Sequence, residues 1–329
     1  MKPLLTAVLA ALSLGVAAGP GATQDLIRAQ VSAPGSTAYV VATHVASVLK
    51  QRHGYEMEVA TGFPGIRSMI NNANGEADVT LYAPALSNFL VNRVGPYREL
   101  ENNMELFERL RVLFTFSGDL FTFATYDPEI RTLADLEDKR IFLGPQGAAL
   151  VRIQSQMIED ATGLVAGEDY DLVNVDWASS PALLQDGTVD VLFQLCGLGC
   201  ATWTELSAGR PLYFVGYTEE MLAAPEFQKH VDFPGRFIKE IPPGTWGDGQ
   251  ANEEVVRFVG VTTGLLANET MTDEVAYNIA KAFWETKDDL AQVAPFAAEY
   301  DVENAGFGVI GEMHAGSRRY LVEQGVTLD

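Results

Sequence analysis

The chain has 329 residues, of which 47% are hydrophobic and 20% are charged, so it can bury more than one core and is not of the disordered class. Its 44 acidic and 22 basic residues give a net charge of −22, which opposes binding to nucleic acids and to anionic membrane surfaces. This acidity is typical of a solubilising surface. It also suits attraction of a cationic ligand, and net charge does not decide between the two.

Residues 1–24 have the pattern of a secretory signal peptide. Lys2 supplies the positive charge, residues 4–18 are apolar, and Val16-Ala17-Ala18 ends the run in small side chains. We expect cleavage between residues 18 and 24, which leaves a mature chain near −23, since Lys2 is lost from a total of −22. No later apolar run reaches transmembrane length, so we expect an exported, periplasmic protein.

Strand and helix patterns then alternate along the chain. The first part predicts strands at 26–31, 55–60 and 77–82, with helices at 37–50 and 66–74. The middle predicts strands at 111–116 and 120–125, separated by Ser117-Gly118-Asp119, then a helical turn at 132–137, a strand at 140–143, a helix at 147–161, a strand at 172–175, a helix at 180–185 and strands at 189–195 and 212–215. The last part predicts a long strand at 255–266 and helices at 272–286 and 315–324. This order predicts an α/β protein whose mainly parallel sheet is covered by helices.

The first candidate binding segment joins a predicted strand to a predicted helix at Gly35-Ser36-Thr37, followed by Tyr39. In open α/β sheets, ligands bind at the carboxyl ends of strands, where such loops lie. Ser36 can cap the helix, and the free N–H groups at the helix start suit a carboxylate. The alternative is a plain helix cap with no ligand.

Two further segments have the same setting. Thr61-Gly62-Phe63 precedes a helix that carries Arg67, whose guanidinium can pair bidentately with an anion or lie free on the surface. Gln146-Gly147, which follows Gly144-Pro145, occupies the equivalent place in the second half of the chain. Aromatic residues accompany these loops, and one or two of them would suit a ligand pocket. They are Tyr39, Phe63, Tyr82, Trp177, Trp203 and Trp246.

The sequence offers little that indicates catalysis. The four histidines are scattered without metal-binding spacing, and no nucleophile elbow is present. We therefore expect no catalytic residue, no metal and no cofactor.

Cys196 and Cys200 are the only cysteines. In an oxidising compartment they can form a disulfide across three residues, or remain two separate thiols.

Six motifs in order resemble the TAXI family, the solute-binding subunits of one class of TRAP transporters. They are Pro34-Gly35-Ser36-Thr37-Ala38-Tyr39, Ala60-Thr61-Gly62 with Gly75-Glu76-Ala77-Asp78, Asp135-Leu136 to Gly144-Pro145-Gln146-Gly147, Leu184 to Asp190, Ile241-Pro242-Pro243-Gly244-Thr245-Trp246, and His314 to Tyr320 with Glu323 and Gly325. The resemblance spans residues 26–325.

The resemblance implies a type II periplasmic-binding fold, with a ligand cleft between two α/β lobes. We expect residues 25–118 and 217–329 to form the first lobe and 119–216 the second. It places Ser36, Thr37, Tyr39, Thr61, Gly62 and Gln146 in the cleft, and our full candidate set adds neighbouring residues. That addition consists of Gly35, Phe63, Arg67, Tyr82, Gly147 and Gly197. The implied ligand is a small organic anion, carboxylate-like or amino-acid-like, and the implied partners are the permease subunits of a TRAP transporter.

The chain also departs from the family. Ala83-Pro84-Ala85 stands where the family has Gln-Ser-Asp, Phe63-Pro64 is inserted, and Cys196 to Cys200 replaces a Gly-Ala-Pro loop. Two other functions stay open at this point. One is a receptor of the same fold for an ABC importer. The other is an exported dehydratase-like enzyme with an acid or base among Glu76, Asp78 and Asp176.

Overall fold

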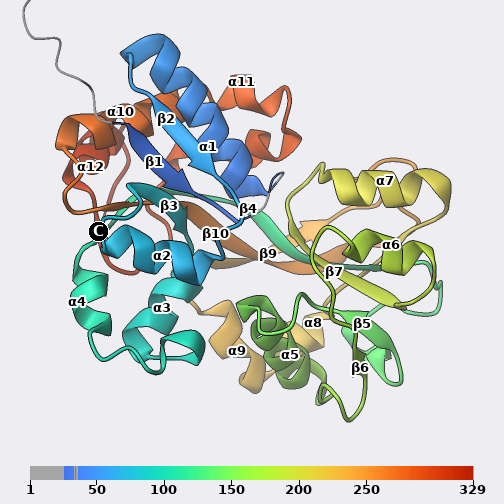
Figure 1. Cartoon of the computed structure of the whole chain (residues 1–329). Helices are drawn as coiled ribbons and strands as arrows, with labels where there is room; N and C mark the ends of the chain where they lie inside the picture. The colour runs from blue at the N-terminus through green and yellow to red at the C-terminus, as the bar shows by residue number, and fades with distance from the viewer. Residues whose placement is uncertain (1–25, 33, 35, 329) are drawn as a thin grey trace, which may run out of the picture.

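The computed structural model describes residues 26–32, 34 and 36–328, so the expected signal peptide and Gly35 lie outside the described residues. The chain forms two α/β lobes (Figure 1). The first lobe contains β1 (Ile27–Gln30), α1 (Thr37–Val48), η1 (Leu49–His53), β2 (Met57–Ala60), α2 (Gly65–Ala73), β3 (Val79–Tyr82), α3 (Pro84–Asn92), η2 (Gly95–Tyr97), α4 (Asn103–Glu108), α10 (Asp273–Trp284), α11 (Lys287–Ala291), η4 (Pro295–Glu299), η5 (Val302–Asn304), β11 (Glu312–Met313) and α12 (Ala315–Glu323).

The second lobe is built from the middle of the chain. It contains η3 (Leu133–Leu136), β5 (Arg140–Phe142), α5 (Ala149–Thr162), β6 (Asp171–Leu172), α6 (Ser180–Gln185), β7 (Val191–Cys196), α7 (Ala201–Gly209), β8 (Tyr213–Val215), α8 (Glu219–Ala223), α9 (Pro225–Val231) and β9 (Arg236–Ile241). In the described part of the chain, no helix combines the length and apolar character needed to span a membrane.

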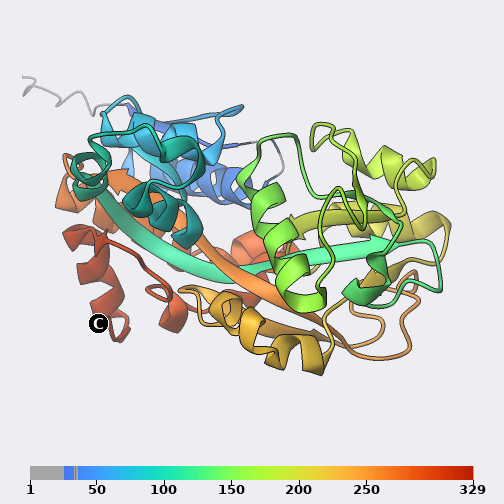
Figure 2. The same ribbon diagram turned by 90° about the horizontal axis from the view of Figure 1, so that it is seen from below.

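Two long strands, β4 (Leu110–Thr125) and β10 (Val256–Asn268), run through both lobes (Figure 2). The main strand order is β2-β1-β3-β10-β4-β7-β5-β6. Strands β1, β2 and β3 are parallel, and so are β5, β6 and β7. β10 is antiparallel to β3 and β4, and β4 is antiparallel to β7. The expected α/β class with two lobes joined by crossover strands is confirmed.

The continuous strand β4 corrects the prediction of two strands separated by a turn at Ser117-Gly118-Asp119. These three residues lie in the middle of the strand, where it passes from one lobe to the other. A Cβ atom on Gly118 would lie 2.8 Å from the Tyr300 ring, so glycine is required here for packing and does not mark a turn. Ser117-Gly118-Asp119 has the composition of a turn, but the glycine is present because of this contact with Tyr300.

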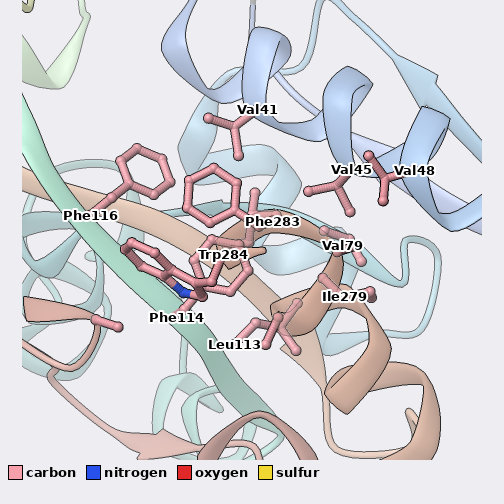
Figure 3. Packing of buried hydrophobic residues seen from close by; sticks show 14 of the residues in the cluster. Val41, Val45, Val48, Val79, Leu113, Phe114, Phe116, Ile279, Phe283 and Trp284 are labelled. Carbon is pink, nitrogen blue, oxygen red and sulfur yellow. The ribbon is translucent and has the colours of Figure 1, made fainter. Parts of the chain in front are cut away.

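The first lobe has a core on each face of its sheet. α1 and α10 pack on one face, with Val41 and Val45 against Phe114 and Phe283, whose rings stack at 4.7 Å (Figure 3). α2, α3 and α4 cover the other face through Met69 and a smaller apolar cluster. The apolar periodicity of α1 and α10 is therefore that of helices packed against a buried strand.

The second lobe extends further along the chain than expected. Tyr217, Met221 and Phe227 pack with Phe123 in one core, and Trp246 and other residues up to 259 pack in the two cores of this lobe. The expected boundary at residue 216 therefore moves to about residue 260, where β10 crosses. The chain does not return to the first lobe after β8, because α8, α9 and β9 pack in the second lobe.

Candidate functional site

The first predicted loop ends at α1, and Ser36 is its N-cap. The Ser36 hydroxyl accepts a hydrogen bond from the Tyr39 backbone N–H at 3.3 Å, as expected of a capping serine. Thr37 and Tyr39 are half-buried.

The second predicted loop lies beside the first. The Gly62 N–H donates to the Ser32 carbonyl at 2.6 Å, and the Phe63 N–H donates to the Val31 carbonyl at 3.2 Å. Gly62 has φ +87°, a conformation that favours glycine. Thr61 and Gly62 are exposed, and Arg67 on α2 is exposed without an ion pair to any described residue. The two loops thus form one edge of the first lobe.

The third predicted loop, in the second lobe, precedes α5. Gln146 and Gly147 are exposed, while Gly144 is buried with φ +139°. A Cβ atom on Gly144 would lie 3.1 Å from the Trp177 ring, which itself meets Phe142 edge-on at 5.2 Å. Trp177 therefore supports the loop that holds Gln146. Trp203 and Trp246, by contrast, are core residues.

Tyr82 does not lie on a surface that a ligand reaches. Its side chain is fully buried in the core under α2 and α3. The Tyr82 hydroxyl accepts from the Ile310 N–H at 2.6 Å and donates to the Gly308 carbonyl at 3.3 Å. Burial raises the pKa of Tyr82 to about 12. We therefore remove Tyr82 from the candidate set.

Gly197 lies in the loop that a disulfide between Cys196 and Cys200 closes. It is buried, and a Cβ atom there would lie 2.6 Å from the Gly118 carbonyl oxygen and 3.1 Å from Phe296 Cβ. Gly197 therefore allows the end of β7 to contact both the crossover strand and η4.

Asp119 is a feature of the lobe junction that the sequence patterns did not reveal. Its carboxylate accepts hydrogen bonds from the Thr37 hydroxyl at 2.8 Å and from the Thr263 hydroxyl at 3.1 Å, and the residue is 3% exposed. Burial raises the pKa of Asp119 to about 6, and the two hydroxyls oppose this rise. The positive end of α1, the first predicted anion site, thus already faces a protein carboxylate.

The carboxylates considered for an enzyme have structural partners or are exposed. Asp78 pairs with Arg28 at 2.9 Å. Asp176 accepts hydrogen bonds from the Ser179 N–H and hydroxyl, at 3.0 and 2.9 Å. Glu76 is exposed. Nowhere in the described ranges do three or more Asp, Glu, His or Cys residues form a group that could hold a metal ion.

A pocket of about 350 Å³ lies where the two lobes meet. It is lined by Ser117, Gly118, Leu120, Leu198, Phe237, Lys239, Glu299, Asp301, Asn304 and Phe307. Lys239 of β9 and Glu299 of η4 form an ion pair at 2.7 Å, so this pair links one lobe to the other. The pocket has walls from both lobes, but its lining contains none of the predicted binding residues.

A family model described as the NMT1-like family matches residues 31–325. A solved structure described as a periplasmic transporter is 16% identical over 91% of this chain and 92% of that chain, with a TM-score of 0.53. The periplasmic aliphatic sulphonate-binding protein of Escherichia coli is 12% identical over 91% and 90%, with a TM-score of 0.47. The ectoine-binding protein of a TRAP transporter is 12% identical over 91% of each chain, with a TM-score of 0.46. No curated protein matches the chain.

Proposed function

The chain belongs to the NMT1-like family, and on this basis we propose that it is a solute receptor that binds a small organic anion between its lobes and delivers it to a membrane transporter. One observation carries the proposal: β4 and β10 cross between two α/β lobes that each present strand-to-helix loops. In open α/β sheets, ligands bind at loops of this kind, beside the carboxyl ends of the strands.

The proposed mechanism is closure without covalent chemistry. The lobes rotate about the crossover strands, bury the ligand and create the surface that the transporter recognises. The ligand contacts come from the loops before α1, α2 and α5. In this proposal they are Gly35, Ser36, Thr37, Tyr39, Thr61, Gly62, Phe63, Arg67, Gln146 and Gly147, with Gly197 at the junction.

We further propose that the partner is a TRAP permease, that the chain is a TAXI-type subunit, and that it acts in the periplasm after loss of residues 1–24. The six motifs in order support this choice. A neighbouring gene for a large multi-span permease would agree with it. A neighbouring P-loop ATPase would instead assign the receptor to an ABC importer.

Native mass spectrometry of gently purified mature protein tests the receptor function. We expect one small organic acid per chain, released on denaturation, and a higher melting temperature when that acid is added back. Conversion of the released compound by the purified protein would contradict the receptor proposal and favour an enzyme.

A further inference from the structure

Arg236 begins β9 at the point where the second lobe meets the first. It pairs with Val261 of β10, and the preceding Gly235 accepts a hydrogen bond from the Thr262 N–H at 2.7 Å. A Cβ atom on Gly235 would lie 2.8 Å from Pro84 Cγ. Pro84 opens α3 two residues after the end of β3, so the residue before Arg236 packs beside the carboxyl end of a first-lobe strand.

Aromatic rings and a histidine hold the Arg236 guanidinium. Its Cζ atom lies 4.9 Å from the centre of the Phe233 ring and 5.9 Å from that of Phe121. Its Nη1 donates to the His230 carbonyl at 3.1 Å and lies 3.1 Å from His230 Nδ1. These contacts use one nitrogen and orient the planar group, while Nε and Nη2 bond to no other described residue.

The charge of Arg236 is not balanced by a direct carboxylate partner among the described residues. The nearest acid in its hydrogen-bond chain is Asp160, which lies 2.6 Å from His230 Nε2 and 2.7 Å from the Lys229 ammonium. Because Nδ1 of His230 accepts from Arg236, Nε2 carries the proton toward Asp160, and the histidine is neutral. Lys229 already pairs with Asp160. The hydrogen-bonded group of Arg236, His230, Asp160 and Lys229 therefore retains one net positive charge, at Arg236.

A second unpartnered group lies nearby. The Tyr217 hydroxyl is buried without a hydrogen-bond partner in the described structure, and the residue is 3% exposed. Burial raises the pKa of Tyr217, and the charge of Arg236 acts against that rise. Burial also lowers the pKa of Arg236 to about 10. A hydroxyl without a hydrogen-bond partner and a guanidinium without a carboxylate partner are the donors that an anion-binding site needs.

We propose that Arg236 is the residue that recognises the anionic group of the ligand, a carboxylate or sulfonate, with the Tyr217 hydroxyl as a neutral second donor. This inference rests on the proposed receptor function and identifies its main determinant of ligand class. Arg236 suits this role better than Arg67, because it is half-buried and held in place, whereas Arg67 is exposed and lacks fixing contacts.

The test compares Arg236→Lys, Arg236→Gln and a matched control, Arg257→Gln, for binding of the co-purified acid by calorimetry. Arg257 is also a lobe-two arginine, but it pairs with Glu219 at 2.7 Å and Glu240 at 2.9 Å. We expect Arg236→Gln to weaken binding about 10- to 100-fold, the effect of one lost charge-assisted hydrogen-bond pair, and Arg257→Gln to leave it unchanged. Arg236→Lys keeps the charge, so it should fold and bind at an intermediate level. Melting temperatures identify any variant that fails to fold.

A second measurement does not depend on the natural ligand. Succinate and methanesulfonate are titrated into ¹⁵N-labelled protein, and the Arg236 Nε resonance is followed by NMR. A saturable shift of the Arg236 Nε resonance supports the inference. A resonance that neither anion moves overturns it. If the protein binds a neutral solute equally well in wild type and Arg236→Gln, the receptor function stands and the role of Arg236 is refuted.

Discussion

Asp119 carries a carboxylate that is withdrawn from water where β4 passes between the lobes. Its hydroxyl partners, Thr37 and Thr263, come from α1 and β10, so the side chain joins three elements. Two neutral donors only partly replace the lost hydration. The folded protein therefore holds the proton of this group more tightly than the unfolded chain does.

This predicts a specific dependence of stability on pH. The pKa of Asp119 rises from 3.8 to about 6 on folding, so the free energy of unfolding should fall as the pH rises between these values and then level off. Asp119→Asn removes the charge, and should stabilise the protein above about pH 7 by roughly 2–3 kcal/mol, with little effect near pH 4. Urea unfolding across this range measures the difference. A variant that is less stable than the wild type above pH 7 would contradict this origin of the pH dependence.

Gly197 provides a second test at the residue scale. Gly197→Ala places a methyl group against the Gly118 carbonyl and Phe296, both fixed by the sheet and η4, so we expect a loss of about 1–3 kcal/mol. Gly209→Ala, at the end of α7, meets no atom within 4 Å and is the control. Equal stability of the two variants in denaturant melts would contradict the contact.

At the scale of elements, each lobe contains the same strand-joining arrangement. In the first lobe, Arg28 of β1 donates from its backbone N–H and its guanidinium to Asp78, just before β3, and also to the Gly75 carbonyl at 2.8 Å. The carboxylate thus links the amino ends of two parallel strands. This end of the sheet is opposite the proposed ligand loops, which gives Asp78 a structural role.

The second lobe repeats this arrangement. Arg140 of β5 donates in the same way to Asp190, just before β7, and to the Gly187 carbonyl at 2.9 Å. In both lobes the arginine precedes the aspartate by 50 residues. Two motifs that carried the family resemblance, Gly75 to Asp78 and Asp186 to Asp190, therefore specify strand registration.

Asp190→Ala tests the contribution of this arrangement to stability. Burial favours the protonated form of Asp190, but the hydrogen bonds and the charge of Arg140 outweigh it and lower the pKa of Asp190. The free energy of unfolding therefore depends on the ionisation of Asp190. Because the folded pKa is depressed, the stabilisation is present at neutral pH and is lost as the pH falls below about 4. Since the pair is partly exposed, we expect the variant to lose on the order of 1 kcal/mol at pH 7. A loss that persists unchanged at acidic pH would contradict this origin.

The elements themselves were predicted unevenly. The predicted helix over 180–185 matches α6, and the apolar spacing of Val41, Val45 and Val48 correctly identifies the buried face of α1. In contrast, α3, α7, α8, α9 and β9 were not predicted. β9 is mostly half-buried and carries the adjacent charged residues Lys239 and Glu240, whose partners, Glu299 and Arg257, lie in other segments. Local periodicity does not contain that information.

At the scale of the whole molecule, Lys239 and Glu299 join the lobes beside the 350 Å³ pocket. Both side chains are 38% exposed, so the pair is screened by water and salt and is a weak constraint on lobe movement. The covalent connections between lobes are the crossover strands. We therefore expect the open and closed forms to interconvert easily, with the ligand determining which one predominates.

Small-angle X-ray scattering tests this expectation. Addition of the co-purified acid should reduce the radius of gyration, because the ligand contacts both lobes only in the closed form. The melting temperature should rise with ligand concentration in the same titration. A radius of gyration that stays constant at saturating ligand would contradict closure, even if binding occurs.

The amino-acid sequence by itself determined the α/β class, the positions of the loops before α1, α2 and α5, and the capping of α1 by Ser36, because these depend on side-chain spacing along one segment. Only the tertiary structure decided that residues 110–125 form one strand, that residues 217–259 belong to the second lobe, and that Tyr82 is buried. It also brought Asp119 to α1 and left Arg236 without a carboxylate partner among the described residues. These properties arise from contacts between segments far apart in the chain, and neither local composition nor periodicity specifies such contacts.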